Sequence, residues 1–148
     1  MAQATEEHVK VGQVHTTSAY LLSKTLTSIL PAVGEFDIME SVNGLDQVYG
    51  TLHCGTDPGG VCDETNGLGS TVPCSGSTCQ GNFHTYAIEV NTKTNPQTLT
   101  WTLDGVAYQT LNNNTLGAAV WKAAVLDAKF VLLNFVSLVQ RDSSMCIP

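Results

Sequence analysis

Positive charge is scarce in this sequence, which holds 6 lysines and arginines against 13 aspartates and glutamates. The few basic residues are scattered, and the formal net charge is −7, so the sequence would repel the phosphate backbone of a nucleic acid. Nucleic acid is therefore excluded as an expected partner. An uncharged substrate, such as a polysaccharide, is indifferent to this charge.

Long apolar runs and a recognisable secretory signal are also lacking. Residues 18–33 are moderately apolar, but Ser23, Lys24 and Thr25 interrupt them. No run approaches the roughly 18 residues that cross a membrane, so we expect no membrane partner. The first seven residues, MAQATEE, are acidic where a signal peptide requires basic residues. The sequence shows no internal repeat.

The remaining composition favours an all-β sandwich. Charged residues make up only 13%, while threonine, serine, asparagine and glycine are plentiful. Alternation and turn residues predict strands at 35–41, 47–53, 83–90, 98–103 and 130–136, and a hairpin turn at Asp104-Gly105. We also predict a short helix at 116–128, capped by Asn114 or Thr115, a helix at 18–30 and a long loop at 55–81.

Four of the five cysteines cluster in a glycine-rich region, at Cys54, Cys62, Cys74 and Cys79. Such clustering predicts local disulfides formed in an oxidising compartment, although three pairings are possible. A zinc site that includes His53 is the alternative, but the spacings match no compact zinc ribbon or finger, so we expect no metal. A glycosylation sequon at Asn113-Asn114-Thr115 agrees with secretion.

The segment GEFDIME at residues 34–40 is the most informative. In a regular strand, Glu35 and Asp37 would share one face, and Glu40 would point with the apolar residues into the core. One bulged residue at Ile38-Met39 removes this conflict and returns Glu40 to the face of Glu35. We therefore predict a bulged strand with three carboxylates on one face.

Crowded carboxylates can divide acid and base chemistry between them. Repulsion makes it costly to ionise all three, so their proton affinities split. One glutamate can then act as a nucleophile while another keeps a proton as a general acid, as retaining glycosidases require. A solvated acidic stripe is the plainer alternative. Function is favoured because apolar residues separate the acids and no lysine or arginine lies nearby in the sequence.

The residue identities resemble those of glycoside hydrolase family 16, the laminarinase and mixed-linkage glucanase group. The segment PAVGEFDIMESVN at 31–43 resembles the catalytic strand of that family. Further blocks follow in the family's order: YGTLHCG at 49–55, PGG at 58–60, FHTYAIE at 83–89, LTWTLDGV at 99–106 and FVLLN at 130–134. In the loop 54–62 the sequence is most similar to the fungal members of the family. The resemblance implies a β-jelly-roll sandwich of the concanavalin type.

The resemblance also implies roles for single residues. Glu35 would be the nucleophile, Glu40 the general acid/base and Asp37 the residue that modulates them. His84 would lie close to the acid/base, with a histidine that only bonds within the sheet as the alternative, and for His53 we favour a structural role.

Two further residues are candidates for substrate binding. Trp101 would offer a platform for a sugar, although an aromatic residue in a strand more often lies in the core. Asn134 would point towards the cleft. No cofactor and no metal are implied.

The resemblance weakens at both ends of the chain. Residues 1–30 lack the tryptophan-rich segment that precedes the catalytic strand in the family, and residues 136–148 depart from its closing strands. We therefore predict a non-matching segment at 1–30, a partial glycoside hydrolase domain at 31–135 and a non-matching tail at 136–148. The jelly roll would be incomplete, because such domains commonly need roughly 200–250 residues.

The function implied by the resemblance is a retaining endo-β-1,3(4)-glucanase that acts on β-glucan through a covalent glycosyl-enzyme intermediate. We expect an extracellular monomer, on the resemblance alone, since the sequence shows no signal peptide. The alternatives are a non-catalytic, lectin-like module that binds glucan, and an inactive fragment of a glucanase.

Overall fold

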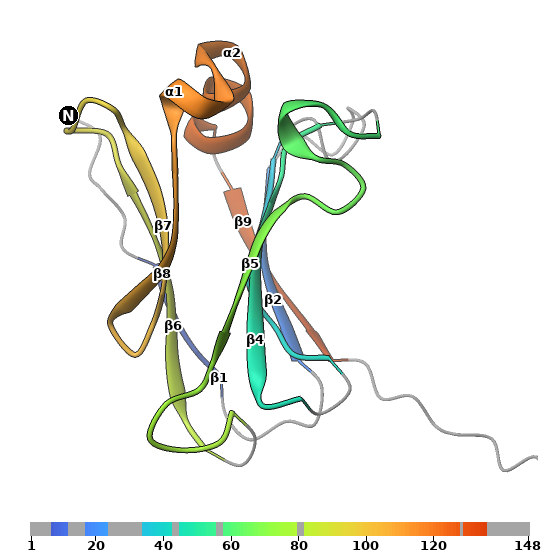
Figure 1. The fold of residues 1–148 in the computed structure, drawn as a ribbon, viewed down its shortest axis with the longest axis vertical. Coiled ribbons are helices and arrows are strands. Elements are labelled where there is room, and N and C mark those ends of the chain that lie inside the picture. The colour runs from blue at the N-terminus through green and yellow to red at the C-terminus, as the bar shows by residue number, and fades with distance from the viewer. Residues whose placement is uncertain are drawn as a thin grey trace, which may run out of the picture.

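The structure is a computed structural model that describes residues 7–11, 17–23, 34–42, 45–55, 58–79, 82–127 and 129–135. In 7–11, 17–23 and 129–135 it describes the backbone alone. Two antiparallel sheets face each other across a common core (Figure 1). The predicted all-β sandwich is therefore confirmed. No helix of the described residues is long and apolar enough to cross a membrane.

The described residues contribute nine strands to the two sheets. The first sheet has the order β1-β6-β7-β8, with β1 at Glu7–Val11, β6 at His84–Asn91, β7 at Thr98–Leu103 and β8 at Val106–Asn112. The second has the order β5-β4-β3-β2-β9, with β5 at Leu68–Pro73, β4 at Gln47–His53, β3 at Glu35–Glu40, β2 at Thr17–Ser23 and β9 at Lys129–Phe135. β3, which carries the acidic segment, lies in the middle of its sheet.

Five strands match their predicted positions closely. The bounds of β4 and β7 are as predicted, β3 ends one residue earlier than predicted, and β6 and β9 are each shifted by one residue at both ends. The hairpin between β7 and β8 turns at Asp104 and Gly105, where φ is +50° and +81°. Both residues therefore adopt the left-handed conformation that a two-residue hairpin turn requires.

Two predictions were wrong. Residues 17–23, assigned in part to a helix at 18–30, form β2, which pairs with β3 on one side and β9 on the other. A short apolar run does not distinguish a buried strand from a helix, and sheet pairing decides the outcome here. The predicted loop at 55–81 contains a short 3₁₀-helix, η1 (Gly60–Cys62), and the strand β5. The glycine and proline of β5 obscure its alternation.

The N-terminal strands belong to the sandwich. β1 pairs with β6 of the first sheet, and β2 is an inner strand of the second sheet. Both come from residues 1–30, the segment in which the sequence shows no match to the family.

The predicted helix at 116–128 is present in a broken form. It consists of α1 (Asn113–Leu116), α2 (Ala118–Trp121) and a π-helical turn, η2 (Lys122–Leu126). Gly117, with φ of +79°, separates α1 from α2. The N-cap is Asn112, not Asn114 or Thr115 as predicted: its side-chain oxygen accepts the N–H groups of those two residues, each at 3.0 Å.

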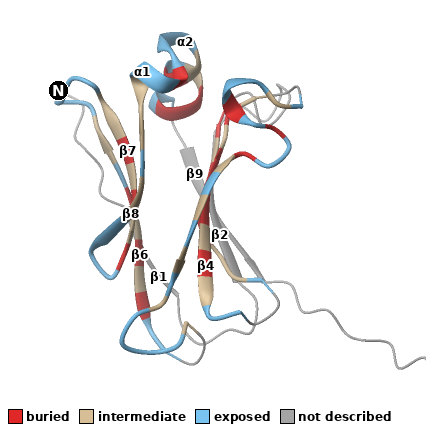
Figure 2. Ribbon diagram, viewed as in Figure 1, coloured by how far each residue is buried: buried red, intermediate tan, exposed pale blue. Residues whose placement is uncertain are grey.

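The core is a cluster of buried apolar residues that come from both sheets, and Figure 2 marks the buried residues along the ribbon. The largest ones that are fully enclosed are Trp101, Trp121, Phe36, Ile38, Leu52, Leu99 and Val48. Two disulfides join neighbouring loop residues, Cys54 with Cys62 and Cys74 with Cys79. The predicted local disulfides are thus confirmed, and the pairing that the sequence left open is settled.

Candidate active site

The pairing of β3 with β4 places all three predicted carboxylates on one face of the sheet. Their partners are every second residue of β4: Glu35 pairs with His53, Asp37 with Thr51 and Glu40 with Tyr49. Alternate residues of a strand share a face, and residues paired across an antiparallel ladder point to the same side. Glu35, Asp37 and Glu40 therefore share a face, opposite the one that packs on the core.

A β-bulge makes this arrangement possible. Along β2, Tyr20 pairs with Asp37 and the neighbouring Ala19 pairs with Met39, so that Ile38 is skipped in the pairing. Ile38 and Met39 are both buried, at 1% and 3% exposure, whereas Glu40 is half-buried. The bulge predicted at Ile38-Met39 is present, and it keeps Glu40 out of the core.

The bulged strand is supported from below by Trp101 of β7. Its indole Nε1–H donates to the backbone oxygen of Asp37 at 3.0 Å, and its ring meets Phe36 edge-on with centroids 6.4 Å apart. Trp101 is 0% exposed. Because the indole ring is fully enclosed, a sugar cannot stack on it. Trp101 is therefore a core residue that packs against the inner side of β3.

The side chains of Asp37, His53 and Glu64 form a chain of polar contacts on the face of β3 and β4 that points away from the core. Asp37, itself 2% exposed, lies with Oδ2 at 3.3 Å from Nε2 of His53. Nδ1 of His53 lies 2.9 Å from Oε2 of Glu64. The other oxygen of Glu64 accepts the backbone N–H groups of Cys54 at 2.9 Å and Gly55 at 3.1 Å. One imidazole therefore bridges two buried carboxyl groups.

The imidazole of His53, which bridges Asp37 and Glu64, is protonated at neutral pH. The hydrogen bond to Asp37, and after it the one to Glu64, raise the pKa of His53 to about 9 against the opposing effect of burial. Burial raises the pKa of Glu64, but the hydrogen bonds from His53 and the two backbone amides outweigh it and lower that pKa overall. An imidazolium can donate to both carboxylates at once.

The pKa values of the two neighbouring acids of β3 move in the opposite direction. Burial raises the pKa of Asp37, and the hydrogen bond from His53 opposes this. Burial also raises the pKa of Glu35, and the charge of Asp37 raises it further, while that of His53 lowers it. These are the shifts that crowding of carboxylates was predicted to produce.

Solved structures with the same architecture identify the fold. The chain is 35% identical to an endo-1,3-β-glucanase from Streptomyces sioyaensis, with a TM-score of 0.78 over 85% of this chain and 49% of that one. A non-specific endo-β-1,3(4)-glucanase of family GH16 aligns with a TM-score of 0.62 and 24% identity, over 89% of this chain and 46% of that one. This chain is similar in fold to the family 16 glycoside hydrolases. Its sandwich is their β-jelly roll.

The likeness extends over most of this chain and part of its relatives. A laminarinase catalytic domain from Thermotoga maritima aligns with a TM-score of 0.66 and 21% identity, over 89% of this chain and 52% of that one. The chain thus spans about half the length of the solved family 16 structures it resembles. No model of a protein family matches the sequence, and no curated protein matches it significantly.

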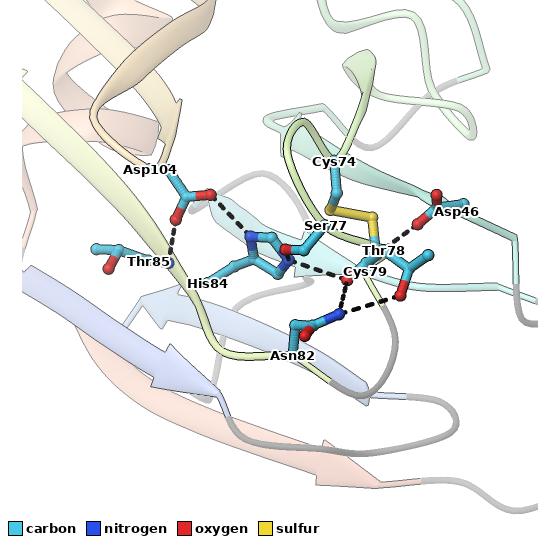
Figure 3. Close-up of polar contacts among 9 residues, drawn as sticks. All are labelled: Asp46, Cys74, Ser77, Thr78, Cys79, Asn82, His84, Thr85 and Asp104. Atoms are coloured by element: carbon cyan, nitrogen blue, oxygen red, sulfur yellow. Dashed lines mark hydrogen bonds and ion pairs between the residues drawn. A yellow bond between two sulfur atoms is a disulfide. The ribbon is translucent and has the colours of Figure 1, made fainter.

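His84, which the family 16 resemblance placed close to the acid/base, lies on the sheet that does not contain the acidic strand β3. It belongs to β6 of the other sheet, where its Nδ1 lies 2.7 Å from Oδ2 of Asp104 (Figure 3). Its Nε2 lies 3.1 Å from the backbone oxygen of Thr78 and 3.3 Å from Oγ of Ser77. His84 shares the inner face of β6 with the buried Tyr86, and the hydrogen bond to Asp104 raises its pKa. The structure therefore gives it the place of a histidine that bonds within the sandwich.

Asn134 lies in β9 opposite Ser18, which in turn lies opposite Glu40. The structure describes only the backbone of Asn134, so the predicted direction of its side chain falls outside the described part of the chain.

Sequence reasoning gave His53 a structural role without linking it to Asp37, and it missed Glu64, the second acid that bonds to His53. The position of His53 beside the acids could have been predicted by pairing the strand 47–53 with the strand 35–40, because His53 is then opposite Glu35. No local pattern marks Glu64, which lies eleven positions after His53. The loop closed by Cys54 and Cys62 brings it back to the sheet.

Proposed function

We propose that this chain carries the catalytic strand of a retaining endo-β-1,3(4)-glucanase that acts on β-glucan. The observation that supports the proposal is the bulge of β3, which turns Glu35, Asp37 and Glu40 to the same open face. A binding module has no use for this arrangement, because crowded carboxylates repel each other and do not improve contact with a neutral sugar.

The roles of the two glutamates follow the family resemblance. Glu35 attacks the anomeric carbon, and Glu40 gives its proton to the glycosidic oxygen, which leaves as a hydroxyl. Glu40 then takes a proton from water, whose oxygen attacks the same carbon and releases the carboxylate of Glu35. Two inversions at one carbon retain its configuration.

Asp37 and His53 adjust the charge of Glu35. The imidazolium of His53 favours the ionised form of Glu35, which a nucleophile requires. Oδ1 of Asp37 is buried and accepts no hydrogen bond from the described residues. This oxygen is available to share a proton with Glu35, which would lower the cost of two neighbouring negative charges.

The expected setting is extracellular. Two disulfides are compatible with an oxidising compartment, and a neutral polysaccharide is a suitable partner for a protein with a net charge of −7. We propose that the protein acts there as a monomer.

The test is release of reducing ends from laminarin and from a mixed-linkage β-glucan by the purified chain. We expect Glu35→Gln and Glu40→Gln each to lower the rate at least about 100-fold, because each removes an acid, base or nucleophile. Glu89→Gln is the matched control, since Glu89 is an exposed carboxylate on β6 of the other sheet. Equal rates in all four proteins would contradict the proposal. Glucan binding without release of reducing ends would instead support the lectin-like alternative.

Chemical rescue separates the two roles. With an activated aryl glucoside, azide should restore turnover of Glu35→Ala as a product of α configuration, and of Glu40→Ala as a product of β configuration. The reverse assignment of products would exchange the roles of the two residues.

A further inference from the structure

We propose that Glu64 is a positioning residue of this site, which orients His53 so that Nε2 of its imidazole faces Asp37. The inference rests on the proposed function and extends it to a residue outside the acidic strand. Glu64 lies in the loop between η1 and β5, far in sequence from β3, and its Oε2 lies 2.9 Å from Nδ1 of His53, whose Nε2 faces Asp37. It would therefore act on Asp37 through the imidazole.

Hydrogen bonds fix both the side chain and the backbone of Glu64. The residue is 6% exposed, and Oε1 accepts the N–H groups of Cys54 and Gly55, the two residues that follow His53 in the chain. Its own backbone N–H donates to the oxygen of Gly59 at 3.0 Å, and its backbone oxygen accepts the N–H of Gly59. Side chain and backbone are thus fixed independently. The other carboxylate oxygen, Oε2, points to Nδ1 of His53 at 2.9 Å.

The imidazole of His53 is confined on its free side. Gly67 lies against it so closely that a Cβ there would stand 2.8 Å from Cε1 and 2.9 Å from Nδ1 of the ring. With φ of +73°, Gly67 also occupies a conformation that other residues rarely adopt. Because Nδ1 is committed to Glu64, the ring presents Nε2 to Asp37.

Three acids face this histidine from the elements packed around it. Glu35 and Asp37 come from β3, and Glu64 comes from the loop after η1. Glu64 bonds to Nδ1 of His53, on the other ring nitrogen from Asp37, and helps to keep the imidazole protonated. The arrangement resembles the carboxylate–imidazole pairs in which an outer acid fixes the tautomer and orientation of an inner histidine.

The experiment compares Glu64→Gln with Asp63→Asn by NMR titration of the histidine ring protons. Glutamine keeps the shape and an oxygen for the backbone amides, but it does not hold a positive charge on His53. We expect the pKa of His53, about 9 in the parent protein, to fall by more than one unit in Glu64→Gln and to stay unchanged in Asp63→Asn. Asp63 is the matched control, because it is an exposed neighbour whose left-handed φ of +48° asparagine tolerates. His53→Asn assigns the signal.

Kinetics provide the second measurement. We expect kcat on laminarin to fall about 10- to 100-fold in Glu64→Gln with KM nearly unchanged, because a misplaced imidazole disturbs the reacting groups and not the binding of the glucan. The basic limb of the pH profile should move to lower pH. A structural role for Glu64 would lower the yield of folded protein and leave the profile of the folded fraction in place.

Each outcome bears on one of the two proposals. An unchanged pKa of His53 in Glu64→Gln overturns the positioning role, whatever the activity. A shifted pKa in a chain that releases no reducing ends supports the contact with His53 but contradicts the proposed glucanase. If Glu64→Gln does not fold, the second measurement is the Nδ1 proton of His53 in the parent protein. A slowly exchanging, strongly downfield Nδ1–H resonance supports a hydrogen bond to Glu64 and hence the inference, and an Nδ1–H that exchanges as in free imidazolium refutes it.

Discussion

Replacement of Trp101 by phenylalanine tests whether the bulge of β3 is supported from the core. The substitution keeps an aromatic ring against Phe36 but removes the Nε1–H that donates to the backbone oxygen of Asp37. A buried acceptor left unpaired costs about 1–3 kcal/mol, and the smaller ring leaves a void that costs about 1 kcal/mol more. The free energy of unfolding should therefore fall by about 2–4 kcal/mol.

The measurement is urea unfolding followed by far-UV circular dichroism, with thermal unfolding beside it. For a chain of this length, the expected loss lowers the melting temperature by about 5–15 °C. Trp121→Phe is the matched control, because Trp121 is 2% exposed and its Nε1–H donates at 2.7 Å to the side chain of Gln97, away from β3. Both variants should lose stability. Only Trp101→Phe should also lower the pKa of His53, since it alone frees the backbone of Asp37.

Two results would refute this reasoning. A Trp101→Phe protein within about 0.5 kcal/mol of the parent would show that the indole hydrogen bond does not hold the bulge. If Trp101→Phe lowers the free energy of unfolding by the same amount as Trp121→Phe and leaves the pKa of His53 unchanged, Trp101 contributes only packing in the core and does not hold the bulge.

Two further predictions concern stability. The pKa of His53 is raised from 6.5 to about 9, so its stabilising effect is complete below the lower value and is lost as the pH rises through the upper one. The free energy of unfolding should fall over that interval by on the order of 2 kcal/mol, and a His53→Gln protein with the same slope would contradict the assignment. Gly50→Ala should destabilise the fold by about 1–3 kcal/mol in urea unfolding, because its Cβ would lie 2.3 Å from Oη of Tyr108 and 2.6 Å from Cδ1 of Trp101. An alanine variant as stable as the parent would show that the sheets separate there without cost.

The bulge could be predicted because the conflict that creates it is local. Residues 35–40 hold three acids and three apolar residues, and no regular strand separates the two sets. Inserting one unpaired residue does, and Ile38 is that residue. The hairpin at Asp104-Gly105 was predictable for the same reason, since the turn chemistry is contained in two residues.

β2 and β5 could not be found in this way because their pairing determines them. TSAYLLS in β2 is compatible with a helix until β3 and β9 enclose it. LGSTVP in β5 contains a glycine and a proline, which weaken the strand signal, yet its Leu68 and Val72 pack on the core and its backbone pairs with β4. In both, contacts with residues distant in sequence override local preference.

The candidate site was missed in part because charge compensation crosses the sheet. The absence of lysine and arginine near Glu35 in the sequence suggested three uncompensated acids. The compensating cation is His53, the partner of Glu35 on the next strand, and its own second acid, Glu64, comes from a loop closed by a disulfide. A count of charges along one strand is therefore incomplete until every second residue of each neighbouring strand is included, because these are the side chains that share its face. By that count the site holds an alternation of acid, imidazolium and acid, which is the pattern that keeps the half-buried His53 charged.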